Sequence, residues 1–249
     1  MTPLEMAGVF VAGIGAGAVN AVVGSGSLIT FPTLLAVGLP PIVANVSNNV
    51  GLVPGGMTGV LGYRPELAGQ RARLIRLGAA SVLGSLAGGL LLLNLPEKAF
   101  TAIVTVLIAV ACVLVLVQPK LNRWLAERRP PHPHGGPWAW VGVLLAGMYG
   151  GYFGAAQGII LIGLLGSFLD EEIQRVNAAK NLLSLLVNAT AAVLFTLVAP
   201  VHWTAVLLIA AGSAVGGFAG ARLGRRLPAP LLRGFIVVIG VVAIVKLLS

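Results

Sequence analysis

The stretch AASVLGSLAGGLLLLNLP at residues 79–96 contains no charged residue and consists almost entirely of apolar and small side chains. A stretch of this length is typical of a helix that crosses a lipid bilayer, which needs about 20 mainly apolar residues. Further charge-free stretches occur at residues 6–63, 99–119, 130–169 and 181–221. A membrane β-barrel would show short segments of alternating hydrophobicity instead. The sequence therefore predicts an all-α polytopic membrane protein.

The composition supports this fold class and excludes others. Of the 249 residues, 57% are hydrophobic and 9% are charged, whereas a soluble domain has about 25% charged residues. The net charge of +9 does not indicate a nucleic-acid partner, because the basic residues form short clusters between apolar stretches, as in cytoplasmic loops. The single cysteine, Cys112, excludes an internal disulfide, and we expect no metal site and no cofactor.

The chain looks like two copies of one unit. Residues 79–96 recur 132 residues later as AGSAVGGFAGARLGRRLP at residues 211–228. The same shift pairs Asn45 with Asn177, and Asn49 with Asn181. Nearer the N-terminus a shift of 134 residues pairs Gly24 with Gly158. We therefore predict a duplicated chain.

Glycines spaced four apart occur at the same place in both copies: Gly84 and Gly88, then Gly216 and Gly220. This spacing is typical of helices that pack closely against one another in membranes.

Each copy contains five apolar pieces. We place them at residues 5–23, 27–38, 42–63, 73–94 and 98–117, and at residues 138–156, 159–169, 176–199, 203–221 and 231–248. The second piece of each copy has about 12 residues, which is too short to span a bilayer comfortably. We interpret it as part of a re-entrant hairpin that precedes three spanning helices. Five full crossings per repeat, ten in total, are the alternative.

The distribution of arginine and lysine predicts that the two copies are inverted. In the first copy, the loop between the third and fourth pieces is basic, and the loop between the fourth and fifth is not. The second copy reverses this order, since its basic loop contains Arg222, Arg225, Arg226 and Arg233. Basic loops face the cytoplasm, so equivalent loops lie on opposite sides of the membrane. Inverted repeats of this kind are typical of secondary transporters.

This topology defines the domains. Residues 1–117 form the first inverted repeat, residues 118–137 a basic cytoplasmic linker, and residues 138–249 the second inverted repeat. The protein is predicted to cross the cell's inner membrane several times, with both termini external.

A glycine-serine turn separates the first two apolar pieces. It comprises Gly24, Ser25, Gly26 and Ser27. Ser25 or Ser27 is expected to cap the short helix that follows. The free N–H groups of that helix, at its positive dipole end, would then form an anion site inside the membrane. The second copy offers Gln157 and Gly158 at the same place. A packing interface of small residues is the alternative.

The third piece of each copy is polar near its start. The first copy has Asn45, Asn48 and Asn49, and the second has Asn177, Lys180 and Asn181, followed on the same face by Ser184 and Asn188. A charged residue within a membrane helix indicates a functional site. The alternatives are hydrogen bonding between helices for the asparagines and snorkelling to the cytoplasmic surface for Lys180. We predict that these side chains bind the substrate together with the glycine turns.

Three stretches of the sequence resemble the sulfite exporter TauE/SafE family of membrane transporters. They are GSGSLITFP at residues 24–32, ANVSN at residues 44–48 and AAKNLLSLLVN at residues 178–188, and the similarity extends through both halves. The resemblance implies a substrate among small sulfur-containing anions or organic acids, such as sulfite or sulfonates.

We therefore expect a secondary transporter or facilitator of a small anion, with no catalytic residues. The expected partners are that anion and the lipid bilayer, and a homodimer is compatible with the sequence. A translocase of a lipid-carrier phosphate is the alternative. An intramembrane enzyme is disfavoured, because His132, His134 and His202 all fall in loops. The seven carboxylates also fall at helix ends or in loops, so we expect none to carry a proton through the membrane.

Overall fold

The computed structural model describes residues 1–126, 136–223 and 229–248, and these residues form ten α-helices and one short 3-10 helix. The first five helices are α1 (Pro3–Val22), α2 (Ser27–Ala36), α3 (Pro41–Gly62), α4 (Arg71–Asn94) and α5 (Glu97–Ala126), with the 3-10 helix η1 at Pro65–Leu67. The second five are α6 (Gly136–Tyr152), α7 (Gln157–Phe168), α8 (Ile173–Val198), α9 (Trp203–Leu223) and α10 (Ala229–Leu248). The predictions for linker residues 127–135, and for Arg225 and Arg226, lie outside the described residues.

The helix boundaries agree with the ten predicted pieces to within a few residues, with one exception. Helix α5 was expected to end at residue 117, but it continues through Pro119 to Ala126. Proline removes one backbone donor and kinks a helix without always ending it, and the residues that follow are mostly good helix formers. The predicted linker, residues 118–137, therefore begins as helix.

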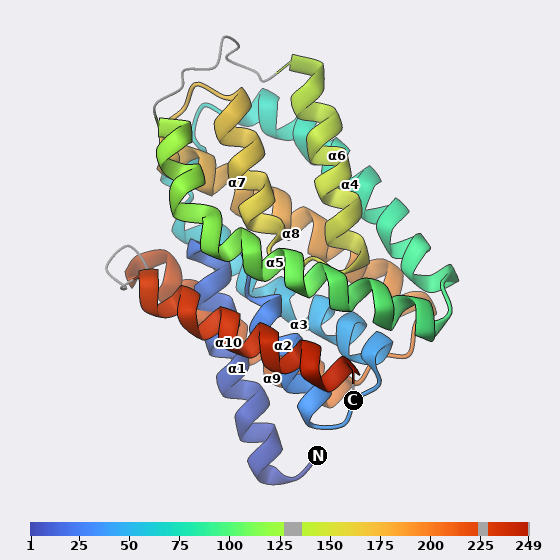
Figure 1. Ribbon diagram of the computed structural model, residues 1–249. Coiled ribbons are helices and arrows are strands. Elements are labelled where there is room, and N and C mark those ends of the chain that lie inside the picture. Colours follow the sequence, from blue (N-terminus) through green and yellow to red (C-terminus); the bar gives the residue numbers. More distant parts are fainter. Residues whose placement is uncertain (127–135, 224–228, 249) are drawn as a thin grey trace.

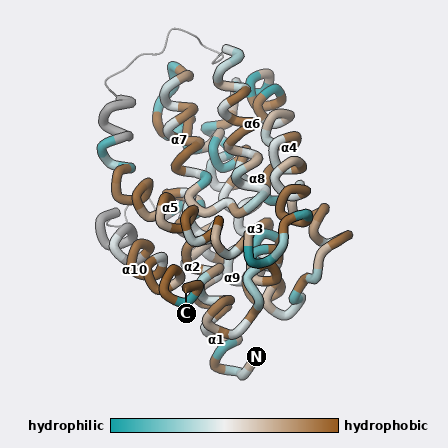
Figure 2. The backbone as a smooth tube through the Cα atoms, turned by 45° about the vertical axis from the view of Figure 1, so that its right-hand side comes forward, coloured by the Kyte–Doolittle hydropathy of each residue, from teal (hydrophilic) through white to brown (hydrophobic). Residues whose placement is uncertain are grey.

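Five of the described helices are long and apolar enough to cross a membrane: Pro3–Val22, Arg71–Asn94, Glu97–Lys120, Ile173–Val198 and Trp203–Arg222. Helices α2 and α7 have only 10 and 12 residues, as expected for the second piece of each copy. Figure 2 shows hydrophobic colour along much of each helix.

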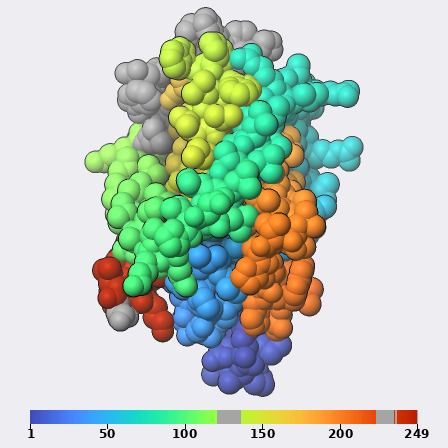
Figure 3. All heavy atoms as spheres, turned by 90° about the vertical axis from the view of Figure 1, so that its right-hand side faces the viewer, coloured from blue at the N-terminus to red at the C-terminus, as the bar shows by residue number. Residues whose placement is uncertain are grey.

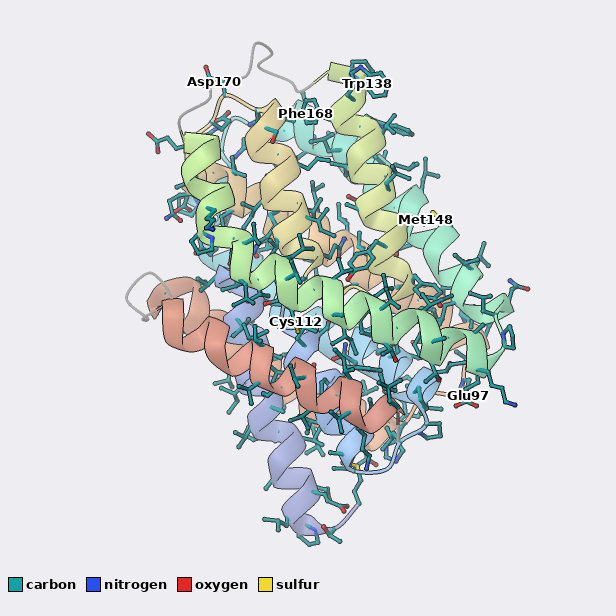
Figure 4. All side chains as sticks on the ribbon, viewed as in Figure 1. Glu97, Cys112, Trp138, Met148, Phe168 and Asp170 are labelled. Atoms are coloured by element: carbon teal, nitrogen blue, oxygen red, sulfur yellow. The ribbon has the colours of Figure 1, made fainter. Side chains whose placement is uncertain are left out.

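Two helical hairpins enter the molecule from opposite ends (Figure 1). Helix α1 packs on α2, and α6 packs on α7. In Figure 4, Trp138 at the start of α6 and Phe168 at the end of α7 both lie near the end that carries Asp170. The N-terminus and the last turn of α10 lie toward the other end. The turns of both hairpins therefore lie in the interior.

The remaining helices cover these hairpins, and each hairpin packs mainly on helices from the other half. Helix α1 packs on α9 and α2 on α10, whereas α6 packs on α4 and α7 on α5. Helices α3 and α8 contact each other near the centre. Figure 3 shows α4 and α6 side by side on one face.

The glycines spaced four apart lie at these helix contacts, as predicted. A Cβ atom at Gly84 would lie 2.1 Å from the carbonyl oxygen of Leu144, and one at Gly88 would lie 1.9 Å from that of Met148. In the other half, a Cβ at Gly216 would lie 1.9 Å from the carbonyl oxygen of Ile14. Any larger residue would push the backbones apart, so these positions require glycine.

We predict that Gly88→Ala destabilises the protein, whereas Gly8→Ala does not. The added methyl group at Gly88 would overlap the α6 backbone, and overpacking costs about 1–3 kcal/mol. At Gly8, also within a helix, a Cβ would meet no atom within 4 Å, and alanine favours helix by about 1 kcal/mol. Thermal unfolding in detergent, followed by size-exclusion chromatography, measures both. Equal melting temperatures for the two variants would contradict the close packing of α4 on α6.

Candidate functional site

The two hairpin turns touch each other. The N–H of Gly158 donates a hydrogen bond of 3.0 Å to the carbonyl oxygen of Gly24. A Cβ at Gly24 would lie 2.4 Å from the Cα of Gly158, so the contact depends on glycine. Beside it, Ala156 has a φ of 58°, which is unfavourable for a residue with a side chain. The backbone at this crossing is therefore tightly constrained.

Gly24 and Gly158 were expected to be equivalent positions of the two copies, and this pairing is wrong. The residue with the conformation of Gly24 is Gly154, since their φ angles are 87° and 76°. Each N–H bonds to the carbonyl five residues earlier, that of Val19 at 3.0 Å and that of Tyr149 at 3.1 Å. The equivalent shift in the first hairpin is therefore 130 residues, and low-complexity glycine patterns gave the wrong register.

The serines do not cap α2 as expected. The N-cap residue is Gly26, and no side chain caps the helix there. Instead, the side-chain oxygen of Asn20 accepts a hydrogen bond of 2.7 Å from the N–H of Gly26. Ser25 is buried, and its hydroxyl has no partner among the described residues; Ser27 is half-buried. Two N–H groups that we expected to be free, those of Gly26 and Gly158, are therefore already paired.

Lys180 is the main feature of the site. Its side chain is fully buried, with 1% of its surface exposed, so the snorkelling alternative is wrong. Its ammonium group donates hydrogen bonds of 2.9 Å to the carbonyl oxygen of Asn20 and 3.5 Å to that of Ala21. The ion pairs among the described residues do not include it. Lys180 is thus a buried cation whose partners are the last carbonyls of α1.

Two neighbours of Lys180 on α8 bind the same place. Asn177 and Asn181 donate side-chain hydrogen bonds of 3.2 Å and 3.1 Å to the carbonyl oxygen of Ala21. The last carbonyls of a helix lack partners in that helix and carry the negative end of its dipole. One face of α8 therefore satisfies the end of α1, as the spacing of Asn177, Lys180 and Asn181 predicted.

The asparagines of α3 occupy a comparable place in the other half. Asn45 donates a hydrogen bond of 2.9 Å to the carbonyl oxygen of Tyr152 at the end of α6. Asn48 accepts a hydrogen bond from the hydroxyl of Thr30 in α2. Asn49 is buried, and its side-chain oxygen has no partner in the described part of the chain.

Not every predicted side chain joins the Lys180 cluster. Gln157 is buried and packs against the backbone at Gly150, where a Cβ would lie 2.4 Å from the Gln157 amide carbon. Asn181, Ser184 and Asn188 share a small cavity with Asn20. This cavity has a volume of about 30 Å³, which is room for one or two water molecules.

Sequence reasoning missed Asn20, which both caps the turn and binds Lys180 through its backbone. A signal was present, because Asn20 is a lone amide one turn before the glycines at the end of an otherwise apolar helix.

Comparison with known proteins agrees with this arrangement. Residues 9–247 match the model of the family described as sulfite exporter TauE/SafE. The chain belongs to this family. As a TauE/SafE family member with several apolar helices, it is a multi-pass membrane protein. No solved structure gave a significant match.

Relatives of this TauE/SafE protein cover nearly its whole length. It is 27% identical to the "Probable membrane transporter protein YfcA" of Escherichia coli K12 over 100% of this chain and 91% of the relative. A "Probable membrane transporter protein" of Haemophilus influenzae is 25% identical over 96% of this chain and 92% of the relative. "Probable membrane transporter protein ORF9" of a Sinorhizobium species is 23% identical over 98% and 92%.

A charged cluster fixes the start of α8. Glu171 forms ion pairs of 2.7 Å with Arg73 of α4 and 2.5 Å with Arg175 of α8. Partial burial raises the pKa of Glu171, but hydrogen bonds and charge from Arg175 and Arg73 outweigh burial and lower that pKa below its ordinary value. Stabilisation by this carboxylate is therefore present above its ordinary pKa and is lost as the pH falls through the lowered one.

We predict that Glu171→Gln lowers the melting temperature at neutral pH, and that the difference from wild type shrinks as the pH falls below the ordinary carboxyl pKa of 4.5. At low pH the wild-type carboxyl is also protonated and loses the same attraction. Thermal unfolding in detergent across a pH series measures this. Asp170→Asn is the matched control, because Asp170 is exposed and next in sequence. A difference that stays constant with pH would rule out the ion pairs as its cause.

Proposed function

We propose that this chain is a secondary transporter or facilitator of a small anion, a sulfur-containing oxyanion or organosulfonate, and that it works by alternating access of two inverted repeats. The buried cation Lys180 carries this proposal. A buried charge without a carboxylate partner is costly, and an anionic substrate would stabilise it. The family description and the relatives' names support transport as the activity.

The packing pattern supports inverted repeats. The hairpin of each half packs on helices of the other half, and the helix pairs correspond when residues of α1–α5 are exchanged with those of α6–α10. The two hairpins also enter from opposite ends. One unit inserted in both orientations can form two related states, one open to each side of the membrane. In this reading α2 and α7 are re-entrant.

The Lys180 contacts suggest how the anion would act. Lys180 belongs to the second half, and the carbonyls of Asn20 and Ala21 belong to the first. An anion that binds the ammonium group would replace these carbonyls and free the end of α1 from α8. Substrate binding would thereby loosen the contact between the halves. Asn177 and Asn181 would supply neutral donors beside the charge.

We predict that Lys180→Met weakens anion transport by about tenfold or more, since a hydrogen bond to a charged group contributes about 1.5–3 kcal/mol and 1.4 kcal/mol is a factor of ten. Lys180→Arg, which keeps the charge, should be less harmful. Uptake of labelled sulfite into proteoliposomes, at matched protein levels, measures both. Lys98→Met is the control, because Lys98 is exposed at the start of α5. Unchanged uptake with Lys180→Met would remove this lysine from the site.

We also predict that both termini are external and that the basic linker is cytoplasmic. Single cysteines in a Cys112→Ser background, at Thr2 and at Pro131, should then label from opposite sides of the membrane. A membrane-impermeant thiol reagent applied to intact cells or inside-out vesicles distinguishes the sides. Labelling of the Pro131 position only from outside would contradict the inverted arrangement.

A further inference from the structure

A second cavity, of about 170 Å³, lies between the ends of several helices near the start of α8. Its polar lining comes from Tyr63 after α3, Gln118 of α5, and Gln174 and Asn177 of α8. Pockets for drug-sized ligands measure roughly 300–1,000 Å³, so an occupant of this cavity has only a few heavy atoms. Tyr63 directly precedes the arginine-rich loop between α3 and α4, which favours anions on this side.

Two lining side chains each hold an oxygen atom without a partner. Gln118 is 4% exposed and Asn177 is 7% exposed. Within the described part of the chain, the side-chain oxygens of both accept no hydrogen bond. The Asn177 nitrogen donates to the Ala21 carbonyl, which fixes the orientation of this amide, since only the nitrogen can donate. Buried polar atoms are normally paired, so these two oxygens point to a ligand that donates.

We infer that this cavity is an outer subsite for a small monoanion that carries its own hydrogen-bond donor, namely a singly protonated oxyanion or a hydroxylated sulfonate. Gln118 and Asn177 accept the O–H hydrogen bond. The inference rests on the proposed anion transport and specifies its substrate class. Asn177 and Lys180 bind the same Ala21 carbonyl, so the subsite adjoins the buried cation that attracts the negative charge.

The chemistry of the lining predicts selectivity. A site built to pair a ligand hydroxyl discriminates strongly against an analogue that lacks it, because the acceptors of the site then stay unpaired. An anion with only acceptor atoms would leave the oxygens of Gln118 and Asn177 unsatisfied. Gln118 therefore acts as a specificity-determining residue, although it precedes Pro119 at the point where sequence alone places the linker.

The test compares two sulfonates that differ only in one hydroxyl group, 2-hydroxyethanesulfonate and ethanesulfonate. Isothermal titration calorimetry with the purified full-length protein in detergent measures both affinities. We expect the wild type to bind the hydroxylated anion about tenfold more tightly, the size of one well-made hydrogen bond. Gln118→Met, which is close in volume and lacks the acceptor, should abolish this preference. Gln174→Met is the matched control in the same cavity and should retain it.

The outcomes separate the subsite from the transport function. Binding of both sulfonates with equal affinity by the wild type overturns the subsite and leaves anion binding in place, and this comparison needs no variant to fold. An unchanged preference in Gln118→Met also overturns the role of Gln118. If the wild type binds neither sulfonate and no sulfite, the proposed function fails and the subsite fails with it.

Discussion

The buried ammonium group of Lys180 imposes a constraint on the whole fold. A cation inside a membrane protein needs negative potential around it, and here that potential comes from the end of a helix instead of a carboxylate. The carbonyls of Asn20 and Ala21 can serve only if α1 ends in the interior. The helix therefore cannot run to the far surface as an ordinary spanning helix does. The hairpin, its glycine turn and the short helix α2 are consistent with this single requirement.

A helix end inside the molecule must be held tightly, because an unpaired backbone group at that depth is costly. The glycines supply the necessary closeness. Gly216 and Gly220 bring α9 against the α1 backbone, and Gly84 and Gly88 do the same for α4 against α6. The hairpins are thereby fixed from the sides, and the turns can meet at Gly24 without further support. Close packing and the polar site are parts of one arrangement.

Much of this fold could be predicted from the sequence, because apolar stretches bounded by proline, glycine and charge determine where helices begin and end. The same rule failed at Gln118, where the signal for a linker was a proline that the helix tolerates. The polar face of α8 was predictable from spacing alone. The pairing of Gly24 with Gly158 was not, since contact and equivalence give the same pattern in sequence. The cap by Asn20 depended on how the chain bends back, which no local pattern specifies.

The two halves differ most at the position where α8 has Lys180 and α3 has Asn48. Asn48 is neutral and is bound by Thr30 of its own half, whereas Lys180 reaches across to the other half. Two lysines at these positions would repel each other and would hold an anion more firmly than transport allows. A single cation beside neutral amides attracts a monoanion and can still release it. Because the charge belongs to one half only, the two states of the proposed cycle need not be equal in energy, and the direction of net transport can depend on the chain itself as well as on the gradient.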